Sequence, residues 1–142
     1  VVAVEPTAEL RDAAVAMHSS DRIEWLDDSL PDLALLHPRT GVFDVVMLTA
    51  VWMHLDLAER RRAMPVVAGL LAPGGVIIMS LRHGPVPPGR RMFEVSAGET
   101  IELAESAGLR IVRRLDGQDG FFGRPDVSWT RLAFCRNSET GE

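Results

Sequence analysis

The sequence predicts an α/β fold, a three-layer sandwich in which helices pack on a mostly parallel sheet that ends in an antiparallel hairpin. Two observations lead to this prediction. Short apolar runs of strand length alternate with longer segments whose apolar residues recur at helical spacing. No helical segment separates the last two runs, 109 to 115 and 127 to 135, so these two strands should pair antiparallel. A chain of 142 residues is expected to form a single domain.

The chain opens with the pattern strand, helix, strand. Val1 to Glu5 is apolar until the acid, and a helix follows with Leu10, Ala13, Ala14 and Met17 on one face. A second short strand, Asp21 to Leu26, ends at the acidic pair Asp27 and Asp28. An irregular or helical stretch then follows from Leu30 to Leu36.

The segment FDVVMLTAVWMHLD, residues 43 to 56, is the centre of the prediction. The unbroken run Val45 to Leu48 is typical of a strand buried on both faces of a parallel sheet. It is followed by the small and polar residues Thr49 and Ala50, and ligands bind at the carboxyl ends of such strands. We therefore expect the functional site at this edge of the sheet.

The segments after this strand repeat the alternation. Asp56 and Glu59 form a capping box for a helix from Leu57 toward Leu71, and Pro65 should make this helix kink or restart near Ala63. The apolar run 76 to 81 is the next buried strand. The loop 82 to 91, rich in proline and glycine, is expected to form a pocket wall. Ser96 and Glu99 give a second capping box, for a helix through Ala107.

Composition narrows the function. A net charge of −5 argues against nucleic acid as the main partner. No apolar run approaches the roughly 18 residues of a membrane span, so we expect a soluble, cytoplasmic protein. The single cysteine, Cys135, offers no metal site.

All basic residues are arginine, which indicates the coding bias of a GC-rich, bacterial genome. For Arg60 to Arg62 a solvated helix face is favoured over an anion site, whereas for Arg90 and Arg91 both interpretations stay open.

Four stretches in order, VVAVEP, EWLDDSLP, FDVVMLTAVWMHL and LLAPGGVIIMSLRHGP, resemble the class I S-adenosylmethionine-dependent methyltransferases, which have a Rossmann-like sheet. The resemblance covers nearly the whole chain and implies S-adenosylmethionine as cofactor. It implies the cofactor-binding residues as follows: Glu5 with Pro6 at the ribose, Asp27 or Asp28 with Ser29 at the adenine, and Thr49, Ala50 and Val51 at the methionine side.

The family's first strand and glycine-rich turn have no counterpart in this sequence. In the family that strand lies between the strands that correspond here to the apolar runs beginning at Val1 and at Val45. We therefore expect an N-terminally truncated domain whose sheet has a gap with two unpaired edges.

The implied reaction is transfer of the cofactor's methyl group to a nucleophile of a small-molecule or other substrate, with the fragment inactive alone. No catalytic residue is assigned, but His54 and His83 follow predicted strands and are candidates for accepting a proton. Trp52, Phe121 and Phe122 are candidates for an apolar pocket, whereas core packing is favoured for Trp129. The alternative is a non-catalytic pseudo-methyltransferase or interaction domain that keeps the fold but has lost cofactor binding.

Overall fold

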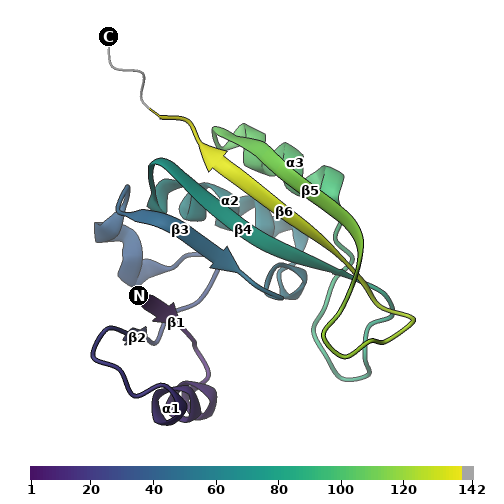
Figure 1. The fold of residues 1–142 in the computed structure, drawn as a ribbon, viewed down its shortest axis with the longest axis horizontal. Helices are drawn as coiled ribbons and strands as arrows, with labels where there is room; N and C mark the ends of the chain where they lie inside the picture. The colour runs from purple at the N-terminus through teal and green to yellow at the C-terminus, as the bar shows by residue number, and fades with distance from the viewer. Residues whose placement is uncertain (139–142) are drawn as a thin grey trace.

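The computed structural model describes residues 1–138. Its helices and strands are, in chain order, β1 (Val2–Val4), α1 (Ala8–Met17), β2 (Glu24–Leu26), the 3-10 helix η1 (Ala34–Arg39), β3 (Phe43–Leu48), the 3-10 helix η2 (Trp52–His54), α2 (Leu57–Leu70), β4 (Leu71–His83), α3 (Ala97–Ser106), β5 (Leu109–Asp119) and β6 (Ser128–Arg136) (Figure 1). None of the helices in this part of the chain has the length and apolarity that crossing a membrane requires.

The strands form two sheets, a parallel pair β1–β2 and a four-stranded sheet in the order β3–β4–β6–β5. Strands β3 and β4 are parallel, and β6 runs antiparallel to both β4 and β5. The predicted α/β class with a terminal antiparallel hairpin is confirmed. The hairpin strand β6 returns between β4 and β5, so β5 forms the outer edge of the sheet.

The expectation that residues 45 to 48 are buried on both faces is wrong. Among the described residues β3 pairs with β4 alone, and Val45 and Met47 are 50% and 66% exposed, whereas Leu48, on the opposite face, is buried. The cause is that helices α2 and α3 cover only one face of this sheet, and no described helix covers the other, on which Ile78 of β4 is also 42% exposed. The gap expected from the resemblance is present, because β1 pairs only with β2 and is not joined to β3 in the described residues.

Helix α1 forms where its spacing predicts, but none of its residues is buried. Leu10 and Met17, predicted to lie on one apolar face, are 59% and 77% exposed. The periodicity of the segment is sufficient to identify the helix. Burial of its apolar face requires a neighbouring element, and the described residues supply none.

Helix α2 begins at the predicted capping box: Glu59 N donates to Asp56 Oδ1 at 2.8 Å, and Asp56 N donates to Glu59 Oε2 at 2.8 Å. The helix does not restart near Ala63 but runs continuously across Pro65 to Leu70. Met64 and Val67 are buried on either side of the proline. Their packing against the core compensates for the amide that proline lacks.

The main core lies between the four-stranded sheet and helices α2 and α3, which cover one of its faces (Figure 1). The expected solvated face at residues 60 to 62 is only partly present, because Arg60 is 3% exposed. Its Nε donates to Glu99 Oε1 at 2.8 Å, and its Nη1 donates to the carbonyl of Leu55 at 2.6 Å. Arg62, by contrast, lies at the surface and pairs with Asp32.

The ion pair between Arg60 and Glu99 also explains why the second predicted capping box is incomplete. Glu99 N donates to Ser96 Oγ at 3.1 Å at the start of α3, as predicted. The Glu99 carboxylate does not return to the Ser96 backbone because it binds Arg60 on α2. The sequence signal identified the cap correctly, but the tertiary contact with Arg60 uses the Glu99 carboxylate that would have completed it.

Candidate functional site

The first group of predicted cofactor residues lies where β1 and β2 end. Glu5 N donates to the carbonyl of Leu26 at 3.1 Å, so the two parallel strands stay paired up to Glu5. Glu5 Oε1 accepts from Thr7 N at 2.9 Å, which orients the carboxylate. Its second oxygen has no partner among residues 1–138 and is available to a ligand hydroxyl. Pro6 is exposed beside it.

The acidic pair after β2 divides into two environments. Asp28 accepts from Ser29 N through Oδ1 and from Leu35 N through Oδ2, both at 2.9 Å. Its carboxylate thus holds the segment that leads into η1. Asp27 is 69% exposed and its only ion-pair partner in the described part of the chain is Arg11, at 3.4 Å. Of the two acids, Asp27 has the freer acceptor capacity.

The second group lies where β3 ends. Thr49 and Ala50 are exposed, and Val51 is half-buried. Ala50 has φ of +55°, a conformation that costs a non-glycine residue about 1 to 3 kcal/mol and is concentrated at functional sites. Its N–H donates to Ser80 Oγ at 2.9 Å, so β4 fixes the turn at the end of β3. Sequence reasoning missed Ser80, although a lone serine within an apolar strand was a usable signal.

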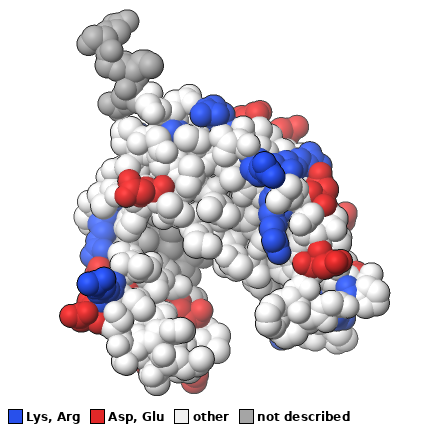
Figure 2. Space-filling model, viewed as in Figure 1, with Lys and Arg blue, Asp and Glu red and all other residues white. Residues whose placement is uncertain are grey.

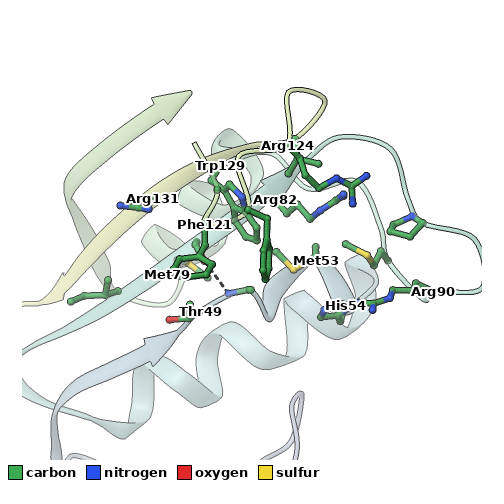
Figure 3. A pocket seen from close by; sticks show the side chains of 18 residues that line it. Thr49, Met53, His54, Met79, Arg82, Arg90, Phe121, Arg124, Trp129 and Arg131 are labelled. Atoms are coloured by element: carbon green, nitrogen blue, oxygen red, sulfur yellow. Dashed lines mark hydrogen bonds between the residues drawn. The ribbon is translucent and has the colours of Figure 1, made fainter. Parts of the chain in front are cut away.

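A pocket of about 760 Å³ opens beside Thr49 and Ala50. Its wall comes from the ends of β3 and β4, from η2, from β6, and from the loops after β4 and before β6 (Figure 3). In the space-filling view a hollow separates the lobe of β1, β2 and α1 from the lobe formed by these loops (Figure 2). Arg82, Pro87 and Arg90 line the pocket, which confirms that the loop 82 to 91 forms a pocket wall.

The aromatic residues are distributed differently from the prediction. Phe121, Phe122 and Trp129 line the pocket. Trp52 is fully buried in the core and is not part of the pocket wall. Trp129 is half-buried and packs against the core, as predicted, but it also lines the pocket. Alternation along β6 could have shown this, since Trp129 shares its face with Arg131 and the opposite face carries the buried residues Thr130, Leu132 and Phe134.

The two histidines have different surroundings. His54 lines the pocket, and its Nδ1 lies 3.1 Å from the carbonyl oxygen of Arg91. A carbonyl can only accept, so Nδ1 donates there and Nε2 of the neutral ring is free to accept a proton. His54 therefore presents a proton acceptor in the pocket.

His83 points away from this pocket. Its Nε2 lies 2.8 Å from Thr130 Oγ1, which in turn donates to Asp116 Oδ1 at 3.2 Å. The pKa of the Asp116 carboxyl is held below its usual value, first by a hydrogen bond from Arg114 and then by the one from Thr130, so it stays an acceptor. The His83 Nε2–H is therefore used in a chain of hydrogen bonds that runs through Thr130 to Asp116. The residue lines a separate cavity of about 300 Å³.

Comparison with known proteins agrees with this arrangement. A family model described as a methyltransferase domain matches residues 1–79 of the 142. No curated protein sequence matches the chain. Among solved structures, an S-adenosylmethionine-dependent methyltransferase from Methanosarcina mazei superposes with a TM-score of 0.75 at 14% identity, covering 98% of this chain and 82% of that one.

Two further structures show the range of proteins with this fold. The 1,6-didemethyltoxoflavin-N1-methyltransferase of Burkholderia thailandensis, with its substrate and S-adenosylhomocysteine bound, has a TM-score of 0.74 at 17% identity over 97% of this chain and 61% of that one. The cyclase SpnF has a TM-score of 0.70 at 15% identity over 96% of this chain and 66% of that one. Identities this low establish the fold, which can host other reactions as well.

The chain belongs to the methyltransferase domain family and has the class I S-adenosylmethionine-dependent methyltransferase fold. It is an enzyme domain for methyl transfer. The residues present fit part of S-adenosylmethionine, the cofactor that the resemblance implies. Glu5 offers a free carboxylate oxygen and Asp27 an exposed carboxylate. No glycine-rich turn adjoins the strand ends within the described residues.

Proposed function

We propose that this domain methylates a small molecule held in the pocket beside Thr49 and Ala50, with the cofactor bound across the ends of β1, β2 and β3. The observation that carries the proposal is the continuity of the two sites. Thr49 and Ala50, at the cofactor edge of the sheet, are also part of the pocket wall. A pocket of about 760 Å³ is in the range of small-molecule sites. The Burkholderia enzyme, whose structure contains bound 1,6-didemethyltoxoflavin, supports a small molecule as the acceptor.

Each residue has a proposed role. Glu5 accepts hydrogen bonds from the ribose hydroxyls, with Pro6 shaping the turn beside it, and Asp27 accepts from the adenine amino group. Asp28 and Ser29 shape the adenine side through their backbone and the hydrogen bond that joins them. Thr49, Ala50 and Val51 border the methionine side. When bound, the cofactor supplies an activated methyl group, so the protein's contribution is largely to position the acceptor.

His54 is the proposed proton acceptor. An O–H or N–H acceptor must lose its proton as it gains a methyl group. His54 lines the pocket, and its Nε2 has no hydrogen-bond partner in the described residues. His83 is the weaker candidate because its Nε2 is bound to Thr130.

The function is tested by incubating the protein, as its gene encodes it, with S-adenosylmethionine and a panel of small O–H, N–H and S–H nucleophiles. Mass spectrometry should detect an acceptor heavier by one methyl group, together with S-adenosylhomocysteine. No methylated product from any acceptor class, together with no measurable binding of S-adenosylmethionine, would favour the non-catalytic alternative instead.

Replacing Glu5 by alanine should weaken cofactor binding about tenfold to a hundredfold, which corresponds to about 1.5 to 3 kcal/mol for a hydrogen bond to a charged group. Glu5→Gln should lose less, because an amide oxygen can still accept from Thr7 N. Titration calorimetry measures the affinities. The matched control is Glu9→Ala, an exposed acid in the first turn of α1, which should leave affinity unchanged. Equal affinity of Glu5→Ala and the unaltered protein would remove Glu5 from the site.

The proposal includes a further strand between β1 and β3, as the resemblance implies. Edges that face each other across an interrupted sheet leave backbone donors and acceptors unpaired. The protein as encoded should carry this strand and a glycine-rich turn, and saturating cofactor, about a hundredfold above Kd, should raise its stability by about 2.7 kcal/mol, several degrees in Tm. Residues 1 to 142 alone should show almost no shift. A clear cofactor-dependent shift for the short chain would contradict this account.

A further inference from the structure

The wall of the pocket is basic, although the protein as a whole is acidic. The chain carries 20 acidic and 15 basic side chains. Yet the residues that line the pocket include four arginines, Arg82, Arg90, Arg124 and Arg131, and no aspartate or glutamate among those described. Such a wall attracts anions and disfavours cations.

Three of these arginines, Arg82, Arg90 and Arg124, form what we call the arginine rim. They come from the end of β4, the loop after it and the loop before β6, and Figure 3 shows them around the side of the pocket that also holds His54. Arg131 lies on the other side of the pocket in the same view. The convergence of two chain segments, one with Arg82 and Arg90 and the other with Arg124, gives the pocket a charged end.

Most hydrogen-bond donors of the rim are unused within residues 1–138. Arg82 spends one donor, Nη1, on the carbonyl of Pro85 at 3.0 Å. Arg124 makes a long contact of 3.4 Å to Asp126. The Arg90 side chain has no hydrogen-bond or ion-pair partner in this part of the chain. Since a guanidinium carries five donors in a planar fork that matches a carboxylate, the rim retains the capacity to bind one.

The remainder of the pocket is apolar and aromatic. Phe121 and Phe122 are 97% and 85% exposed and pack edge to face with ring centroids 5.3 Å apart, and Trp129 adds a third aromatic side chain. Large exposed aromatic side chains on a pocket wall mark a binding surface. Met53, Met79 and Met92 add flexible, polarisable contacts that adapt to a planar body.

We propose that the methyl acceptor is an anionic small molecule, a carboxylate on an aromatic or extended apolar body, whose charge is bound by the arginine rim and whose body lies against Phe121, Phe122 and Trp129. This inference rests on the proposed function, because it names the substrate class of the same pocket. His54, on the rim side, would then lie near the polar part of the acceptor, where an ionisable nucleophile is expected.

The test measures binding of four probes with the same ring system and different charge to the protein as encoded: naphthoate, naphthamide, naphthylmethylammonium and naphthyl phosphate. Naphthoate should bind about tenfold more tightly than naphthamide, and the ammonium more weakly than either. Raising the salt concentration should reduce the difference in affinity between naphthoate and naphthamide, because salt screens the charge of the arginines. Equal binding of naphthoate and naphthamide would overturn the inference, and a preference for naphthyl phosphate over naphthoate would overturn the assignment to a carboxylate.

Variants of the arginine rim test whether these side chains bind the carboxylate of naphthoate. Arg82→Met combined with Arg90→Met should remove the preference for naphthoate while changing naphthamide affinity less than twofold. Arg90→Met alone should remove part of the preference for naphthoate. Since the Arg90 side chain has no partner in the described residues, this variant keeps the test valid even if Arg82→Met disturbs the loop. The matched control is Arg113→Met, an exposed arginine on β5 outside the pocket, which should change nothing. Unchanged preference in the rim variants would contradict the proposal.

Cofactor titration of the same variants separates this inference from the proposed function. Affinity for S-adenosylmethionine should stay unchanged in the rim variants. A loss of cofactor affinity with naphthoate binding intact would assign the rim to the cofactor and overturn the inference, while methyl transfer itself would stand. Absence of methyl transfer to every acceptor, with naphthoate preference intact, would overturn the function and leave the anion site.

Discussion

Replacing Arg60 by methionine is expected to lower the free energy of unfolding by about 3 kcal/mol. Arg60 is 3% exposed and binds Glu99 Oε1 at 2.8 Å, the carbonyl of Leu55 at 2.6 Å and that of Glu94 at 3.3 Å. The substitution removes all of these donors and leaves Glu99 and two carbonyls without them. Partial exposure of Glu99, 30% at its side chain, keeps the loss near the lower end for buried ion pairs. Urea unfolding followed by circular dichroism measures it.

Arg62→Met is the matched control on the same helix. Arg62 pairs with Asp32 at 2.6 Å, but both side chains are 60% exposed, so its loss should cost less than about 1 kcal/mol. Adding Glu99→Leu to Arg60→Met should recover part of the stability, because it removes the carboxylate left without a partner. Similar small losses for Arg60→Met and Arg62→Met would show that the buried pair is not a major contributor.

Replacing His54 by glutamine should lower kcat about a hundredfold to ten-thousandfold if its Nε2 accepts the acceptor's proton. The reason is that glutamine cannot take up the proton that the methyl acceptor loses. Cofactor affinity should be unchanged, since no predicted cofactor residue contacts the ring. Methyl transfer measured with a saturating acceptor gives kcat, and titration calorimetry gives the cofactor affinity.

Two other histidines serve as controls for this experiment. His83→Asn should lower the rate less than tenfold, because its Nε2 is bound to Thr130 outside the pocket. His37→Gln should have no effect, because His37 is exposed and its Nε2 binds the carbonyl of Asp32. A kcat of His54→Gln within tenfold of that of the unaltered enzyme would assign the proton acceptor to another group.

Local signals in the sequence predicted the elements well. The Asp56 and Glu59 capping box, the spacing of apolar residues in α1 and the paired terminal strands all depend on residues close in the chain, and each element forms where predicted. The order of the quoted motifs was sufficient to identify the methyltransferase fold, and the absence of a motif for its first strand predicted the gap between β1 and β3. The sequence thus determined the fold class of the protein and predicted the edge of the sheet at which the candidate site lies.

The tertiary structure decided which side chains have partners. Arg60 and Arg62 look alike in the sequence, yet only Arg60 meets Glu99 across a buried helix contact, and that contact also removes Glu99 from its cap. Trp52 is buried in the core, whereas strand alternation places Trp129 on the face of β6 that carries Arg131, so that Trp129 lines the pocket as well as packing against the core. His54 and His83 both follow predicted strands, but only folding places one in the pocket and joins the other to Thr130. Contacts between residues distant in the chain depend on packing that local patterns do not encode, and the same packing brings Arg124 to the side of the pocket that holds Arg82 and Arg90.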